Sequence, residues 1–171
     1  SLSRIQGALP GPLEAERRLL EANVLMAQGR YADAAAALRS APSDDWGAYA
    51  RFNLGVALVR SGDALEGQRW LEAVGTMRAV SDEQLALRDR ANLALGFARL
   101  QQREAEPAVA ALTRVRLDGP FTSRALLGLG WAESDAKRPD RALVSWLELR
   151  EHRLLDSAVQ ESYLAVPYAY A

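Results

Sequence analysis

The sequence predicts an all-α protein, an α-solenoid of antiparallel helix pairs stacked side by side. Apolar residues recur at helical spacing along the chain and are interrupted by glycine, proline and aspartate at turns. No segment alternates apolar and polar residues as a strand does, and no hairpin dipeptide such as Asn-Gly occurs. The clearest unit runs from Phe52 to Val74, where a Ser61-Gly62-Asp63 turn joins two short amphipathic helices.

The N-terminal half is expected to contain two helix pairs. The expected helices cover residues 13–28, 31–39, 46–60 and 64–77. Pro12 suits the start of the first helix, because proline lacks only an N–H that has no helical partner there. Gly29 and Gly62 separate the helices within the two pairs, since glycine readily adopts the left-handed conformation that ends a helix. Between the pairs, Asp44 or Asp45 can cap the third helix.

The C-terminal half is expected to contain two more pairs and the beginning of a fifth. The expected helices cover residues 82–102, 104–115, 121–136 and 141–150, followed by a last helix that starts at 155 or 156. Ser81 and Gln84 have the spacing of a capping box at the first of these helices. Pro107 lies in a first helical turn, where proline is tolerated, and Pro167 is expected to kink the last helix.

A repeat becomes visible when the turns inside the pairs are aligned. The turn residues are Gly29, Gly62, Arg103 and Lys137, at spacings of 33, 41 and 34 residues. The first-helix small residues, seven positions before each turn, are Ala22, Gly55, Gly96 and Gly130. The second-helix small residues, five positions after it, are Ala34, Gly67, Ala108 and Ala142, and the large residues four further on are Leu38, Leu71, Leu112 and Trp146. Small side chains let two helices approach to about 8–10 Å, and the large residues are expected to fill the space between successive pairs.

This pattern resembles the tetratricopeptide repeat family, which has a period of about 34 residues. The best match is Asn53-Leu54-Gly55 followed by Gly62-Asp63. The resemblance implies one right-handed array over residues 1–171. Its repeats cover residues 13–45, 46–80, 82–120 and 121–154, with a partial fifth at 155–171. Two turns lack glycine, one spacing is long, and the aromatic residue expected near the start of each repeat is missing. An unrelated helical bundle is the alternative.

The resemblance also implies a binding site, because the first helices of such repeats line a concave groove for extended peptides or helices. Leu19 and Asn23 map to this groove by position. So do Phe52, Asn53, Val56, Arg60, Arg90, Leu93, Phe97, Arg124, Leu127 and Trp131. Phe52, Phe97 and Trp131 are interpreted as lying at like positions, where they would form an aromatic floor. The alternative is that many of these side chains pack between helices.

Several classes of function are not supported by the sequence. The net charge of −1 argues against a nucleic-acid binder. The absence of cysteine excludes disulfides and thiolate metal sites, and no other metal-ligand spacing occurs. His152 lies in a polar turn without a catalytic partner, and Gly128-Leu129-Gly130 lies within a helix rather than in a phosphate-binding loop. We therefore expect no enzymatic activity, no cofactor and no metal. No apolar run approaches the roughly 20 residues that would insert into a membrane.

The leading hypothesis is a scaffold that binds a peptide or helix of a protein partner within a bacterial assembly. Lys137 is the only lysine, as is typical of proteins from GC-rich bacterial genomes. Similarity to degenerate bacterial repeat proteins favours the envelope or periplasm over the cytoplasm. The alternatives are a regulatory or substrate-presenting domain of a larger enzyme, and a small-ligand or glycan binder that uses Phe97 and Trp131. Both chain ends are interpreted as cuts in a longer protein, so the apolar residues 163–170 are expected to allow self-association.

Overall fold

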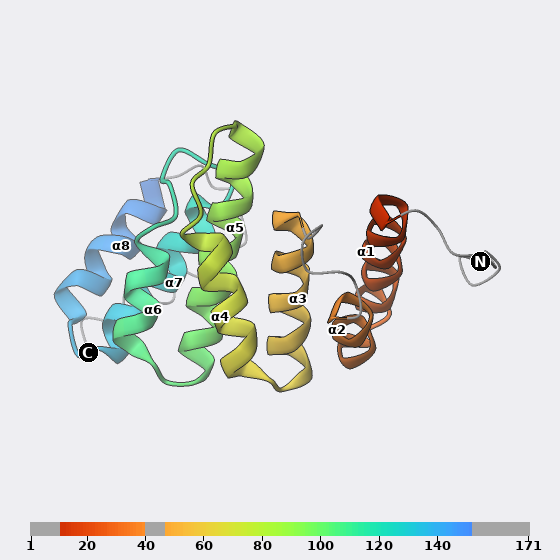
Figure 1. Ribbon diagram of the computed structural model, residues 1–171. Helices are drawn as coiled ribbons and strands as arrows, with labels where there is room; N and C mark the ends of the chain where they lie inside the picture. Colours follow the sequence, from red (N-terminus) through yellow and green to blue (C-terminus); the bar gives the residue numbers. More distant parts are fainter. Residues whose placement is uncertain (1–10, 40–46, 152–171) are drawn as a thin grey trace. The chain divides into compact units, whose positions relative to one another are not determined.

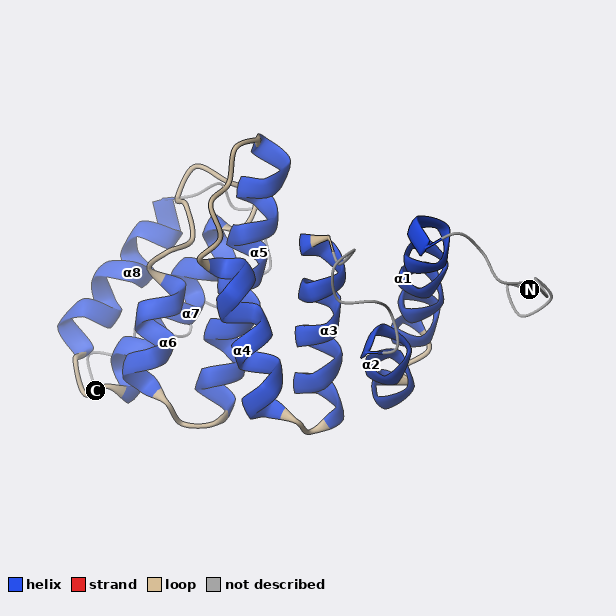
Figure 2. Ribbon diagram, in the orientation of Figure 1, coloured by secondary structure: helices blue, strands red, loops and turns tan. Residues whose placement is uncertain are grey.

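The computed structural model describes residues 11–39 and 47–151, and this part of the chain is helical without strands (Figures 1 and 2). Its helices are α1 (Gly11–Ala27), α2 (Tyr31–Arg39), α3 (Ala48–Ser61), α4 (Ala64–Gly75), α5 (Asp82–Gln101), α6 (Ala105–Leu112), α7 (Thr122–Asp135) and α8 (Pro139–Glu151). The predicted all-α fold of helix pairs is confirmed. Several features of the sequence prediction lie outside the described residues: the cap at Asp44 or Asp45, His152, and the partial fifth repeat with Pro167 and the apolar tail.

The chain divides into two compact units, Ser1–Val74 and Gly75–Ala171. The expected single array over the whole chain therefore stays a prediction, and each unit is described by itself. In the first unit α1 pairs with α2, and α2 packs against α3. Its core is mainly alanine and leucine: Ala22, Ala34, Ala35, Leu38, Leu54, Ala57 and Leu58. The many alanines reflect how closely these helices approach one another.

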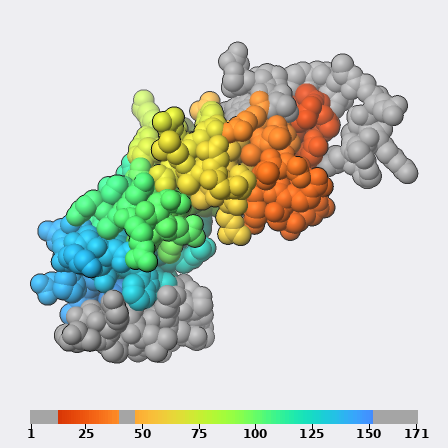
Figure 3. Space-filling view, turned by 90° about the horizontal axis from the view of Figure 1, so that it is seen from below, coloured from red at the N-terminus to blue at the C-terminus, as the bar shows by residue number. Residues whose placement is uncertain are grey.

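The second unit contains α5 to α8, in which α5 packs on α6, α6 on α7, and α7 on α8. Figure 3 shows its described residues, green through blue, as closely packed atoms. One core cluster contains Leu93, Ala108, Leu112, Val115, Ala125 and Ala132, and another contains Leu126, Leu127, Ala142, Trp146 and Leu149. Each cluster draws side chains from at least two helices, so no helix of this unit buries its apolar face alone.

The four aligned turns share one backbone geometry. The turn residues Gly29, Gly62, Arg103 and Lys137 have φ angles of +75°, +103°, +62° and +63°. At each turn this residue donates its N–H to the carbonyl three residues earlier, and the next residue donates to the carbonyl five residues earlier. For example, Gly62 donates to Val59 at 3.3 Å and Asp63 to Leu58 at 2.9 Å. This pair of bonds is the Schellman motif, which satisfies the last carbonyls of a helix. The four turn residues aligned in the sequence are therefore structurally equivalent, even where the turn residue is not glycine.

The small residues are buried where two helices of a pair cross. A Cβ built on Gly55 would lie 2.9 Å from Leu71 Cγ, and a Cβ on Gly67 would lie 2.7 Å from the carbonyl oxygen of Gly55. The same relation holds between Gly96 and Leu112, and between Gly130 and Trp146. In three repeats, then, the first-helix glycine receives the large residue of its own second helix. This contact explains why the spacing between them is constant.

Ion pairs connect neighbouring repeats within each unit. In the first unit Arg39 of α2 pairs with Asp63 and Glu66 around the next turn. In the second unit Arg138, beside a turn residue, pairs with Glu106 of α6 and with Glu133 of α7. Arg138 lowers the pKa of Glu106, and the two carboxylates raise the pKa of Arg138, Glu106 more than Glu133. These pairs help to fix one helix pair against the next.

A second polar contact holds the loop between α6 and α7. Asp89 of α5 is fully buried and accepts a hydrogen bond from Arg116 Nε at 2.7 Å. It also accepts one from the backbone N–H of Arg116 at 3.3 Å. Asp89 raises the pKa of Arg116, mainly through this side-chain hydrogen bond. A buried carboxylate needs hydrogen bonds and an ion pair to offset its lost hydration. Asp89 therefore has a structural role, which is to hold this loop.

Candidate partner-binding surface

The residues predicted to line a groove divide into buried and accessible side chains. Phe52, Leu93 and Leu127 are only 4%, 4% and 8% exposed. Leu93 belongs to the core cluster around Leu112, and Leu127 to the cluster around Trp146. In this structure these three side chains contribute to the interior rather than to an accessible surface. The remaining predicted residues are exposed or half-buried.

The expected aromatic floor requires a correction in register. Phe97 and Trp131 each lie six residues before their turn residue, whereas Phe52 lies ten before Gly62. The residue equivalent to Phe97 in that repeat is Val56, which is half-buried. Phe52 therefore does not lie at the same position, and its burial agrees with this. Any shared aromatic position is confined to the second unit.

In the first unit the predicted residues form a polar surface. Asn53 Nδ2 donates to Asn23 Oδ1 at 2.7 Å, which connects α3 with α1. Arg60 lies 4.9 Å over the ring of Tyr31 and donates to its hydroxyl at 3.1 Å. Beside this pair is an open pocket of about 270 Å³, lined by Gly29, Arg30, Tyr31, Ala32, Asp33, Arg60 and Ser61. Leu19, also assigned to the groove, is half-buried against the core.

In the second unit α5 and α7 contact each other through Phe97. A Cβ built on Gly128 would lie 3.0 Å from Phe97 Cζ, so the ring of α5 rests where α7 has no side chain. Trp131 is half-buried, and its ring meets that of Trp146 edge to face, with centroids 5.1 Å apart. Both aromatic side chains are thus held by neighbouring helices while part of each stays accessible. Arg90 and Arg124 are exposed on the same two helices.

These residues repeat at equal distances from the turns. In both α5 and α7, an arginine lies thirteen positions before the turn residue, a small residue lies nine positions before it, and an aromatic residue lies six positions before it. The six residues, which we call the Arg–aromatic face, are Arg90, Ala94, Phe97, Arg124, Gly128 and Trp131. Sequence reasoning found four of them but missed Ala94 and Gly128, the second of which leaves the space that the ring of Phe97 fills. Counting positions from the turns would have identified both.

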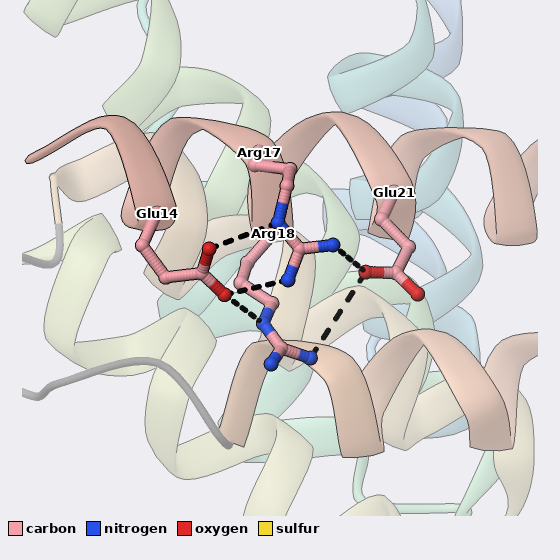
Figure 4. Close-up of polar contacts among 4 residues, drawn as sticks. All are labelled: Glu14, Arg17, Arg18 and Glu21. Atoms are coloured by element: carbon pink, nitrogen blue, oxygen red, sulfur yellow. Dashed lines mark hydrogen bonds and ion pairs between the residues drawn. The ribbon is translucent and has the colours of Figure 1, made fainter. Parts of the chain in front are cut away.

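A cluster of charges on α1 is a self-contained ion-pair network (Figure 4). Glu14 Oε1 lies 2.6 Å from Arg17 Nη2 and 2.9 Å from Arg18 Nε, and both arginines also approach Glu21. The hydrogen bond from Arg17 is the main cause that lowers the pKa of Glu14 to about 2, and it raises the pKa of Arg17. Spacings of three and four residues are those of pairs that stabilise a single helix. The network therefore supports α1 and is not a candidate site.

Residues 11–39 and 47–151 contain no candidate metal cluster and no candidate membrane span. Within those ranges no group of three or more histidine, aspartate or glutamate side chains is placed to hold a metal ion. Over the same ranges, none of the helices has the length and apolar character needed to cross a membrane.

The fold defines a helical-repeat protein. Side chains at equivalent positions of its first helices lie on the surface. The sequence profile described as "Tetratricopeptide repeat" matches residues 19–73 and 93–153, which together are more than half of the chain. The protein belongs to the tetratricopeptide repeat family, and the resemblance inferred from the turn spacing is confirmed. No curated protein matches the sequence.

Solved structures agree with the family assignment. "MamA 41-end from Desulfovibrio magneticus RS-1" is 18% identical with a TM-score of 0.71, and the match covers 91% of this chain and 83% of that one. "MamA MSR-1 C2" is 22% identical with a TM-score of 0.66, covering 92% and 83%. "MamA RS-1 ArsTM double mutant" is 17% identical with a TM-score of 0.65, covering 92% and 94%. At these identities the similarity is one of fold, and it supports the α-solenoid class.

Proposed function

We propose that this chain is a non-enzymatic scaffold that binds a segment of a partner protein along the first helices of its repeats. Membership of the tetratricopeptide repeat family supports an interaction scaffold. The observation that carries the proposal is the Arg–aromatic face, where the same side-chain types recur at the same distance from two turns. A surface that repeats with the fold suits an elongated ligand, because successive parts of the ligand meet equivalent side chains.

The composition of this surface supports protein binding more than catalysis. Aromatic residues and arginine are enriched among side chains that dominate binding energy at protein interfaces. Trp131 and Phe97 are each held by a neighbouring helix, so little side-chain freedom would be lost when a partner binds. The first unit has a candidate surface of its own, on which Asn53 and Arg60 present polar groups.

Site-specific photo-crosslinking in the source cell tests this proposal. A photoreactive residue is placed at Arg60 or Arg124 on first helices, and at Arg69 or Ala110 as matched controls. All four positions are exposed, and each control lies seven residues after a turn on a second helix. We expect one shared partner band from the first-helix positions and none from the controls. Equal crosslinking from all four, or crosslinks from the controls alone, would overturn the proposal.

Two finer expectations remain predictions. One is a place in a bacterial, envelope-associated assembly, which cell fractionation with an antibody against this chain would test. The other is the alternative of a regulatory or substrate-presenting domain. That alternative predicts that the crosslinked partner is an enzyme or its substrate. No described residue favours it over the scaffold.

A further inference from the structure

The Arg–aromatic face has a chemistry that the first unit does not share. In α5 and α7 the three positions read arginine, small residue, aromatic residue. The same positions read Glu16, Leu20 and Asn23 in α1, and Tyr49, Asn53 and Val56 in α3. The two repeats of the second unit thus present a duplicated site, whereas the two repeats of the first unit differ from it and from each other.

We propose that the Arg–aromatic face binds an extended acidic protein segment with apolar side chains between its carboxylates. The carboxylates pair with Arg90 and Arg124, and the apolar side chains lie against Phe97 and Trp131. This inference rests on the proposed function and specifies the chemistry of the partner.

The charge of the surface carries the first step of the argument. Arg90 and Arg124 are exposed at equivalent positions in the N-terminal halves of α5 and α7. The guanidinium group binds a carboxylate through two parallel hydrogen bonds, which gives both strength and orientation. A basic pair of this kind is complementary to a ligand with two carboxylates.

The aromatic rings carry the second step. Phe97 crosses from α5 onto the backbone of α7 at Gly128, and Trp131 is supported edge to face by Trp146. Gly128 is buried and the ring of Phe97 fills the space beside it, so a ligand meets the two rings and the two arginines rather than the helix backbone. The face therefore has a charged row and an apolar row that run from one helix to the next. This arrangement selects a ligand with both kinds of side chain.

The helix packing sets the spacing of the ligand's charges. Helices in contact have axes about 8–10 Å apart, so arginines at equal positions on α5 and α7 are separated by about 10 Å. A ligand in the extended polyproline II conformation advances roughly 3.1 Å per residue and repeats its side-chain direction every three residues. Carboxylates about three residues apart in the ligand would meet both arginines. An acidic segment with a different spacing would reach one of them at a time.

Binding of a designed peptide to the full chain tests the inference. The probe is a fluorescein-labelled peptide of about a dozen residues with glutamates three residues apart and leucines between them. Its binding is measured by fluorescence anisotropy. Matched peptides replace the glutamates by glutamine, or shift them to a spacing of two. We expect the first peptide to bind and both matched peptides to bind about tenfold more weakly or less, with an affinity that falls as salt is added.

Protein variants locate the site. Arg90→Glu and Arg124→Glu should each weaken binding about tenfold, since a close charge pair is lost and a repulsion is added. Arg69→Glu and Arg78→Glu change exposed arginines elsewhere by the same charge and should leave binding unchanged. Gly128→Val should displace the ring of Phe97 and weaken binding with both arginines present. Circular dichroism confirms that each variant is folded before it is measured.

The outcomes separate this inference from the proposed function. Equal binding by the Arg90 and Arg124 variants, or equal binding of the glutamine peptide, overturns the acidic-segment inference. So does tighter binding of a short single-stranded oligonucleotide that the same variants abolish, because the ligand would then be a nucleic acid. If crosslinking still finds a partner on the first helices, the scaffold proposal stands without this chemistry. If crosslinking finds none there, the scaffold proposal itself fails.

Discussion

Replacing Gly62 by alanine should destabilise the protein more than the same replacement at Gly47. Neither added Cβ would meet another atom within 4 Å, so the two sites do not differ in packing. They differ in backbone conformation, because φ is +103° at Gly62 and −56° at Gly47. A left-handed conformation costs an L-residue roughly 1–2 kcal/mol. We therefore expect Gly62→Ala to lower the free energy of unfolding by about 1–2 kcal/mol. Gly47 is the N-cap of α3, where alanine is less favourable than glycine, so Gly47→Ala should lower it by about 0.5 kcal/mol.

The reverse substitution extends the same test to the turns without glycine. Arg103→Gly and Lys137→Gly remove a strain of roughly 1–2 kcal/mol but add the entropy cost of glycine, about 0.5–1 kcal/mol. Each should leave stability unchanged or raise it by up to about 1.5 kcal/mol. Urea denaturation followed by far-ultraviolet circular dichroism measures all four variants. Equal destabilisation by Gly62→Ala and Gly47→Ala would refute the reasoning, because a left-handed backbone is present at Gly62 and not at Gly47.

Two further predictions concern packing and charge. Gly130→Ala should lower the free energy of unfolding by about 1–3 kcal/mol, because its Cβ would overlap the indole of Trp146. Gly119→Ala, where the nearest atom would be 3.6 Å away, is the control, and equal effects in urea denaturation would contradict this account. The carboxyl of Glu14 should titrate near pH 2 by carbon NMR rather than near its ordinary value of 4.5. Because its pKa is lowered in the folded state, ionised Glu14 stabilises the fold fully above about pH 4.5 and loses this effect as the pH falls towards 2. Arg17→Ala should raise the titration midpoint, and an unchanged midpoint would exclude Arg17 as the main cause.

The fold could be predicted from the sequence because its strongest constraints are local. A Schellman turn needs a residue with a left-handed backbone conformation, which glycine adopts easily. Gly29 and Gly62 therefore indicate two of the turns directly. Arg103 and Lys137 do not have the favoured residue type. They were located by their distance from buried small residues, which helix crossing fixes independently of the turn. Two kinds of constraint therefore indicated the same register.

The candidate surface was less predictable because exposure depends on neighbours. The sequence analysis places Phe52 in the aromatic floor by residue type, although its distance from Gly62 places it about one helical turn before the position of Phe97 and Trp131. Leu93 and Leu127 lie about one helical turn after the exposed residues Arg90 and Arg124. Only the packing of adjacent helices shows that both leucines are buried. Gly128 was recognised as a helical glycine, but its contact with Phe97 spans two repeats and depends on the stacking of α7 on α5.

The contact between Phe97 and Gly128 limits how this protein could be engineered as a set of interchangeable modules. The ring belongs to one repeat, and the vacant place that receives it belongs to the next. A repeat moved alone into another array would bring its ring without the matching gap, or its gap without the ring. Transplanting recognition would therefore require at least the continuous segment from α5 through α7. If the Arg–aromatic face binds the partner as proposed, the junction between repeats is the unit that carries its specificity, and inserting or deleting one repeat there would alter specificity as well as length.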